Sequence, residues 1–362
     1  MYLLSLDLKN FRNIEELVFT PDRGVNVIFG QNGQGKTNLL ESIYILTGAK
    51  SYRTRKDVEM IMRGSEFGVV KSHFFLRGRE QQIRLTVSSK GRNAELNRGS
   101  DARASELAGF LCCVLFSPEH LQLVKGSPEQ RRKFMDLALC QLSPKYLTDI
   151  KKYTRLLRHK NSVLKDYFQI PDAEDLLDVY DRQIVKVAAE VSIARKSFCE
   201  KLLLLARDDY SVISGNEERL DLFYHSSLWS KDDLSPESGI IKVKESRKTD
   251  IRLGNMTLGP HRDDIGITLD GTDARIFASQ GQQRSVVLAL KLAESAVMES
   301  TLGEKPLLLL DDVLSELDSS RQEFLLRQLE GGQSVITGCD PSFISKRIAA
   351  SLFEMRNGRL FS

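Results

Sequence analysis

The sequence has 362 residues, a formal net charge of +3 and 41% hydrophobic residues, an ordinary composition for a globular protein. This length accommodates two domains, or one domain with a large insertion. The small net charge gives no global signal for nucleic acid, so any such contact must be local, and no apolar run approaches the length of a membrane span.

Five cysteines without C-x-x-C spacing indicate reduced thiols, with neither a disulfide framework nor a metal site. The N-terminus alternates like a strand and lacks the form of a signal peptide. We therefore expect a cytoplasmic protein. The cysteines are Cys112, Cys113, Cys140, Cys199 and Cys339.

The first third of the chain predicts a β-rich lobe. Its apolar, β-branched runs are typical of strands, and leucines and isoleucines at helical spacing after residue 36 predict a helix between the second and third strands. The expected strands cover residues 3–11, 24–30, 67–78, 82–89 and 111–118.

The middle of the chain predicts helices from Pro128 to about Tyr210, broken near Pro171. Residues 176–210 contain no Gly or Pro and favour one long helix, far too short for an extended coiled-coil rod. Residues 211–250 are polar, and we expect irregular structure there.

Alternating elements return near the C-terminus and favour one α/β domain, with lobes 1–125 and 251–362 on either side of a helical insertion, 126–250. We expect strands at 263–271 and 274–279, a helix from about Gln282, a buried strand at 306–312, a helix from Ser319, a strand at 334–338 and a hairpin at Asn357-Gly358.

A glycine-rich loop stands between the expected strand 24–30 and the helix after it. Its sequence, Gly30-Gln31-Asn32-Gly33-Gln34-Gly35-Lys36-Thr37, fits the pattern G-x-x-x-x-G-K-[ST]. Glycines let backbone N–H groups approach an anion, and the start of the helix adds its dipole. Lys36 can reach the β- and γ-phosphates and Thr37 can ligate Mg²⁺, so the loop predicts nucleotide binding. The alternative is a glycine-rich turn with a chance Lys-Thr.

Two carboxylates end the apolar strand at 306–312. Four consecutive leucines suit a parallel strand covered on both faces, and Asp311 and Asp312 follow at the edge where an open α/β sheet binds its ligand. Asp311 can hold the Mg²⁺ that bridges the phosphates, and Asp312 can orient or deprotonate the attacking water. Alone, the pair could be a solvated turn; with the loop, it predicts that ATP binds.

A third element begins a helix at Ser279, Gly281 and Gln282. A serine side chain, a glycine N–H and a helix N-terminus together can form a second phosphate cradle. An ordinary helix cap, with Ser279 capping and Gln282 at the third helical position, explains the same residues equally well.

Two basic segments are candidates for DNA contact. Between Lys145 and Lys165, seven basic residues accompany one acidic residue, Asp149. Either segment could also be a solvated surface, whereas a DNA face would bind the phosphate backbone and be sensitive to salt. The first segment offers Lys151, Lys152, Arg155, Arg158 and Lys160 on much of one helix face, with Tyr146, Tyr153 and Tyr167 interleaved, and the second offers Lys50, Arg53, Arg55 and Lys56.

Two smaller groups remain open. His261 with Asp263 and Asp264 is a weak metal pattern, and we favour a structural hydrogen-bonding role. Arg131 and Arg132 could form an ion-pair cluster at a helix start or belong to an interface.

The order of these elements resembles an ABC-type ATPase head, as in the SMC and Rad50 group, with a much shorter insertion. The sequence resembles the RecF family more closely, over essentially the whole chain. Two departures are His120, where an acidic residue is usual, and ITGCD (336–340), which stands in place of threonine-rich sequence and holds no switch histidine. The matching motifs are LKNFRN (8–13), FSPEHLQLVKGSPEQRRKFMD (116–136), LGPHRDD (258–264) and SQGQQR (279–284).

This resemblance implies a P-loop ATPase head with a β-rich N-terminal lobe and a helical lid or arm. It implies that two copies enclose two ATP molecules, with Ser279, Gly281 and Gln282 acting on the partner's ATP and Ser315–Asp318 at the dimer interface.

The resemblance also implies a function: a weak, DNA-dependent and Mg²⁺-dependent ATPase that clamps single- and double-stranded DNA near gaps. Such a protein works with RecR and RecO, and with RecA downstream, in replication, recombinational repair and the SOS response. A transporter ATPase and an SMC-like structural protein are the alternatives. The motif at 116–136 and the helical insertion argue against the first, and the absence of long heptads against the second.

Overall fold

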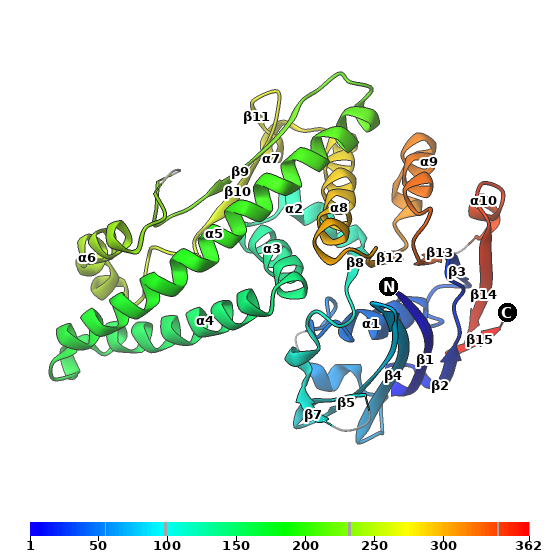
Figure 1. Cartoon of the computed structure of the whole chain (residues 1–362), viewed down its shortest axis with the longest axis horizontal. Helices are drawn as coiled ribbons and strands as arrows, with labels where there is room; N and C mark the ends of the chain where they lie inside the picture. The colour runs from blue at the N-terminus through cyan, green and yellow to red at the C-terminus, as the bar shows by residue number, and fades with distance from the viewer. Residues whose placement is uncertain (55, 98–99, 231–232, 339, 362) are drawn as a thin grey trace.

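The computed structural model describes the chain except residues 55, 98–99, 231–232, 339 and 362. The molecule has a head built on two six-stranded sheets and a long helical arm that projects from it (Figure 1). Both ends of the chain lie in the head (Figure 1). The arrangement confirms the predicted α/β class.

The central sheet of the head is parallel except at one edge. Its β12 strand is buried on both faces, since Leu308 and Leu310 belong to one hydrophobic core and Leu307 and Leu309 to another. The prediction of a strand covered on both faces is therefore confirmed. In spatial order the strands are β15 (Arg359–Phe361), β14 (Ala350–Arg356), β3 (Val25–Phe29), β13 (Ser334–Gly338), β12 (Leu307–Asp311) and β8 (Cys113–Phe116).

The second sheet is antiparallel and comes from the first third of the chain. The helix α1 (Lys36–Ile45) lies between the two sheets, and its Leu39, Leu40 and Ile43 share one core with both of them. This packing fixes the start of α1 relative to the end of β3. In spatial order the strands are β2 (Ile14–Phe19), β1 (Tyr2–Phe11), β4 (Phe67–Leu76), β5 (Arg79–Ser88), β6 (Gly91–Leu96) and β7 (Ser100–Arg103).

The arm consists mainly of α4 (Pro144–Lys165) and α5 (Ala173–Ser214), with α6 (Pro236–Leu253) packed near the far end (Figure 1). The helical stretch is broken between α4 and α5 near Pro171, as predicted, and the chain reverses there. The arm has its own hydrophobic core around Trp229. The C-terminal part of α5 shares the core of the head with α3 (Pro128–Leu142) and α8 (Gln280–Leu302), so the arm continues into the head.

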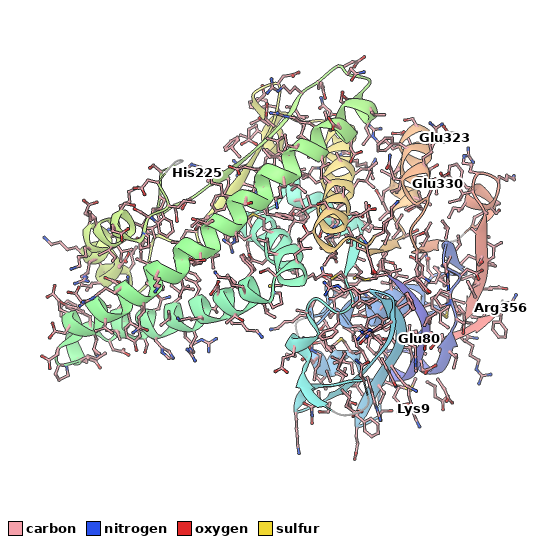
Figure 2. The ribbon with its side chains drawn as sticks, viewed as in Figure 1. Lys9, Glu80, His225, Glu323, Glu330 and Arg356 are labelled. Atoms are coloured by element: carbon pink, nitrogen blue, oxygen red, sulfur yellow. The ribbon has the colours of Figure 1, made fainter. Side chains whose placement is uncertain are left out.

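Shorter elements complete the head. Helix α9 (Ser319–Gln328) buries Leu325 and Leu326, while Glu323 and, just beyond the helix, Glu330 are exposed (Figure 2). The remaining helices are α2 (Gln122–Lys125), α7 (Ala274–Phe277) and α10 (Ser342–Ser345), with 3-10 turns at Asp57–Met60, Ala104–Leu107, Pro118–Leu121, Tyr167–Gln169 and Leu314–Glu316.

Two predictions of secondary structure are wrong. Residues 211–250 are not irregular, because β9 (Leu220–His225) pairs with β10 (Asp264–Leu269) and α6 follows. The polar composition concealed a strand that buries only Leu220 and Leu222. Residues 274–279 do not form a strand: β11 (Thr272–Asp273) ends at once, and the Asp273 side chain caps α7.

Within the described residues, no helix combines the length and the hydrophobicity needed to cross a membrane. Four cysteines, Cys112, Cys113, Cys140 and Cys199, are free thiols, and Cys339 lies outside the described residues. The division of the chain at residues 125 and 250 stays a prediction.

Candidate functional site

The glycine-rich loop links the end of β3 to the start of α1. Gly30, Gly33 and Gly35 have φ angles of +144°, +80° and +118°, a region that residues with a Cβ rarely adopt. A Cβ on Gly30 would also lie 2.4 Å from the carbonyl oxygen of Met355. The loop therefore requires glycine at these positions. It ends at the start of α1, where the N–H groups of the first turn have no carbonyl partner within the helix.

The Lys36 side chain curls back over this loop. Its Nζ donates to the carbonyl oxygens of Gly30, at 2.5 Å, and Gln31, at 2.9 Å. The C-terminal hairpin supports the loop from outside, because Gly358 N donates to Gln34 O at 2.9 Å and Asn357 N donates to Gln34 Oε1 at 2.5 Å. Nothing in the sequence motif pointed to this support.

Asp311 lies at the carboxyl end of β12 and is buried. Its Oδ1 accepts hydrogen bonds from Thr37 Oγ1 at 2.8 Å and Thr337 Oγ1 at 3.0 Å, and its Oδ2 accepts one from the Tyr52 hydroxyl at 3.1 Å. The structure thus brings together Thr37 and Asp311, which the sequence predicted as partners on one Mg²⁺. Burial, with the carboxylates of Asp311 and Glu41, raises the pKa of Tyr52 far above its usual value, so this hydroxyl keeps its proton.

Asp312 faces solvent beside the buried Asp311. Its backbone φ is +53°, an uncommon conformation for a residue with a Cβ. The Asp312 N–H donates to Thr337 Oγ1 at 3.1 Å, and its carbonyl accepts from Ser315 Oγ at 2.7 Å. These bonds turn the second carboxylate outward, where it can meet a water molecule.

Ser279 and Gln282 form a reciprocal cap at the start of α8. Ser279 Oγ accepts from Gln282 N at 3.2 Å, and Ser279 N donates to Gln282 Oε1 at 2.6 Å. The capping alternative is therefore correct for the single chain. Ser279 is nevertheless exposed, as are the neighbouring Ile276 and Phe277, at 63% and 69%. That Ser279 and Gln282 bind the phosphate of an ATP molecule held by a second copy stays a prediction.

The basic segment on α4 is only partly on the surface. Lys160 is 2% exposed and lies 2.6 Å from Asp181 Oδ1, so its prediction as part of a DNA face is wrong. Tyr146 and Tyr153 are also buried, because the apolar stripe of α4 packs against α5. Of the five basic residues predicted to share this helix face, Lys151, Lys152, Arg155 and Arg158 are exposed.

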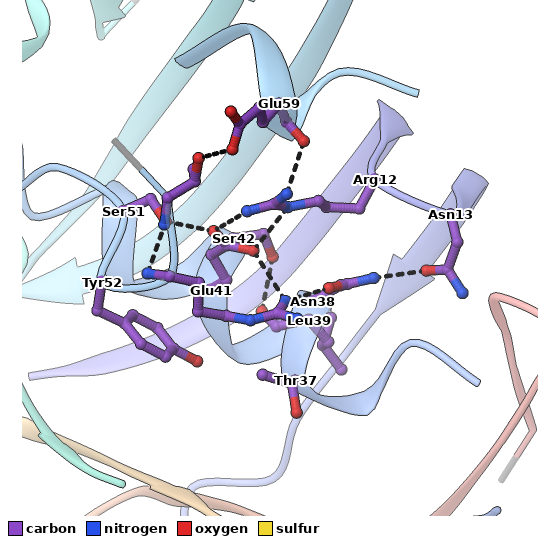
Figure 3. A network of polar contacts seen from close by, with 12 residues as sticks. Arg12, Asn13, Thr37, Asn38, Leu39, Glu41, Ser42, Ser51, Tyr52 and Glu59 are labelled. Atoms are coloured by element: carbon purple, nitrogen blue, oxygen red, sulfur yellow. Dashed lines mark hydrogen bonds and ion pairs between the residues drawn. The ribbon is translucent and has the colours of Figure 1, made fainter. Parts of the chain in front are cut away.

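The second basic segment is tied to α1 by a polar network (Figure 3). Glu41 is fully buried and accepts two hydrogen bonds from Arg12, at 3.0 and 2.7 Å, and others from Ser51 and Arg53. Arg53 therefore has a structural partner, whereas Lys50 and Lys56 are exposed. Arg55 lies outside the described residues.

The sequence motifs pointed neither to this network nor to the hydrogen bond from the Tyr52 hydroxyl to Asp311. One signal was available, since Glu41 stands on the apolar side of α1 between Leu40 and Ile43. A carboxylate there requires buried cationic or hydroxyl partners.

The group at 261–264 joins the arm to the head through hydrogen bonds. The Tyr153 hydroxyl and His261 Nδ1 are 2.6 Å apart, and the buried Asp263 accepts from Ser227 N at 2.7 Å. Arg131 Nε and Nη2 donate to the two oxygens of Asp264 at 2.7 and 2.9 Å. The hydrogen-bonding interpretation of His261 and Asp263 is confirmed, and Arg131 is an ion-pair partner near the start of α3.

Comparison with known proteins defines first a class and then a family. The profile of the RecF/RecN/SMC N terminal domain matches residues 2–349. An Smc head domain from Pyrococcus furiosus shares the fold with a TM-score of 0.58 at 17% identity, covering 99% of this chain and 95% of that chain. The fold is therefore that of an ABC-type ATPase head.

More similar proteins carry one name. The "DNA replication and repair protein RecF" of Agathobacter rectalis is 40% identical over 93% of this chain and 92% of its own length. That of Geobacillus thermodenitrificans is 40% identical over 90% and 89%. A solved structure of "the recombination mediator protein RecF-ATP in RecFOR pathway" has a TM-score of 0.91 at 32% identity and covers 99% of this chain and 97% of that chain. The chain belongs to the RecF family.

Proposed function

We propose that the loop Gly30–Thr37 binds the phosphates of ATP with Mg²⁺. The N–H groups at the start of α1 would hold phosphate oxygens, and Lys36 would exchange its two carbonyl partners for the β- and γ-phosphates. Thr37 and Asp311 are the hard oxygen donors that Mg²⁺ prefers. The ion would neutralise charge on the phosphates. The 2.8 Å hydrogen bond between Thr37 and Asp311 carries this proposal, because it brings the two proposed ligands next to each other.

The proposal extends to slow hydrolysis at a composite site. The outward carboxylate of Asp312 would accept the proton of the attacking water. Ser279, Gly281 and Gln282 of a second copy would close over the phosphates, and Ser315–Asp318 would lie at the interface. The exposed side chains of Ile276 and Phe277, three and two residues before Ser279, support a partner at this surface.

The dimer would act as an ATP-dependent clamp on DNA in the cytoplasm. Lys151, Lys152, Arg155 and Arg158 give the arm an exposed basic row that suits a phosphate backbone without reading sequence. The names of the relatives, a DNA replication and repair protein and a recombination mediator of the RecFOR pathway, support work with RecO and RecR in replication and recombinational repair. The proposal adds, from the family resemblance alone, that the clamp acts near single-strand gaps, helps to load RecA and takes part in the SOS response.

Mixing two inactive variants tests the composite site. Lys36→Ala impairs the loop, and Ser279→Arg places a bulky side chain at the proposed interface. In a mixed dimer, one site combines the intact loop with the intact Ser279, so ATPase activity should exceed the sum of the separate variants. Ser235→Arg, at the equivalent cap position of α6 in the arm, controls for loss of a helix cap.

A mixture that gives only the sum, with Ser279→Arg chains still dimerising on ATP, would exclude the trans arrangement. Normal nucleotide affinity in Lys36→Ala would exclude the loop assignment itself.

A further inference from the structure

The carboxylate of Asp311 has two hydroxyl partners outside the glycine-rich loop. Tyr52 donates to Oδ2 at 3.1 Å and Thr337 donates to Oδ1 at 3.0 Å, in addition to Thr37 of the loop itself. We infer that Tyr52 and Thr337 are positioning residues, which fix the orientation of the Asp311 carboxylate for Mg²⁺. This inference rests on the proposed function of the loop.

Tyr52 is held in place from both sides. Its ring meets the buried Tyr44 ring edge-on, with centroids 5.4 Å apart. Its neighbour Ser51 donates to Glu41 of α1 at 2.5 Å (Figure 3). Its other neighbour, Arg53, donates to the same carboxylate at 3.2 Å. Because α1 begins at the loop, the Tyr52 hydroxyl is fixed to the same helix that carries Thr37.

Thr337 connects the two carboxylate-bearing residues. Its side chain is buried at the end of β13, next to β12. The hydroxyl donates its proton to Asp311 Oδ1 and accepts the N–H of Asp312 at 3.1 Å. A single hydroxyl therefore sets the rotation of Asp311 and supports the left-handed backbone that turns Asp312 outward.

These two hydroxyls act beside Thr37 when the ion is bound. The Thr37 hydroxyl would ligate Mg²⁺ through an oxygen lone pair and could still donate its proton to Asp311 Oδ1, so Tyr52 and Thr337 would hold the rest of the carboxylate. Because Oδ2 accepts from Tyr52, one further lone pair of Oδ2 stays available to the ion or to its water ligands. Groups that orient a metal ligand in this way typically change metal affinity by about 10- to 100-fold.

The test measures the Mg²⁺ concentration that half-saturates binding of a fluorescent, non-hydrolysable ATP analogue. Tyr52→Phe and Thr337→Val should each raise it about 10-fold. Binding of the analogue in EDTA should stay at the wild-type level. Tyr44→Phe, which removes the hydroxyl from the adjoining ring, and Thr337→Ser, which keeps the hydroxyl, are the matched controls and should leave the Mg²⁺ requirement unchanged.

An unaltered Mg²⁺ requirement in both Tyr52→Phe and Thr337→Val would overturn the inference while leaving ATP binding intact. An equal loss of binding in EDTA would also overturn it, because the hydroxyls would then only support the loop. Failure of the wild-type protein to bind the analogue would instead overturn the proposed function.

Discussion

Lys160 distinguishes a structural charge in the arm from a charge that binds DNA. Its ammonium lies 2.6 Å from Asp181 Oδ1 of α5 and 3.9 Å from Asp250 Oδ2 of α6, and both carboxylates are buried. Lys160→Met retains an unbranched side chain of similar length but removes the positive charge. Two buried carboxylates then remain, and Arg247 stays paired with Asp181.

The expected loss of stability follows from these ion pairs. Removing one partner of a buried ion pair lowers the free energy of unfolding by about 3–5 kcal/mol, because the other charge stays buried at low dielectric without its partner. Arg247 Nη2 remains 2.6 Å from Asp181 Oδ2, and Asp250 accepts hydrogen bonds from Thr257 N and Oγ1. Because both carboxylates keep these partners, we expect the free energy of unfolding to fall by about 3 kcal/mol, the lower end of that range.

Urea unfolding followed by the fluorescence of Trp229 measures this loss, because the only tryptophan of the sequence is buried in the arm core. Arg158→Met, an exposed residue of the same helix, is the control and should change stability by less than about 0.5 kcal/mol. Only Arg158→Met should flatten the salt dependence of DNA binding. An unchanged urea midpoint for Lys160→Met, together with a flatter salt dependence, would show that Lys160 binds DNA and has no structural role.

Three further changes test separate parts of the molecule. Asp312→Asn should keep nucleotide affinity but lower ATP turnover at least about 100-fold, since the amide cannot accept the water proton; wild-type turnover would exclude Asp312 as the base. Arg155→Glu with Arg158→Glu should reduce the slope of log affinity for duplex DNA against log salt by about 0.9 for each phosphate that the arm no longer neutralises, with dimerisation intact. Gly30→Ala should weaken nucleotide binding and destabilise the protein by more than about 1 kcal/mol in urea unfolding, because its φ is +144° and a Cβ would meet backbone at 2.4 Å. Gly24→Ala, at the other end of β3 with open space around the new Cβ, should change neither.

The parts of the fold that the sequence predicted depend on local chemistry. Glycines at positive φ followed by Lys36 form a loop that eight consecutive residues are enough to predict. Leu307–Leu310 could be assigned to a buried strand, because a strand covered on both faces needs apolar side chains on each face. In the structure, Leu308 and Leu310 pack into one hydrophobic core and Leu307 and Leu309 into the other. The helices from Pro128 onward follow from periodicity and from the break at Pro171.

The errors and omissions depend on interactions between residues distant in sequence. Lys160 fits a basic helix face by spacing, and only the carboxylates brought by α5 and α6 bury it. Tyr52 and Asp311 are 259 residues apart, so no local pattern links them. The β9 strand was concealed because it buries few residues and needs β10 as its partner.

The central claim is that ATP joins two copies of this chain on DNA. Sedimentation velocity of the wild-type protein tests it most directly, with a non-hydrolysable ATP analogue or ADP, each with and without gapped DNA. We expect a dimer with the analogue, stabilised further by the DNA, and a monomer with ADP. A monomer under all four conditions, at concentrations where the analogue is bound, would contradict the claim.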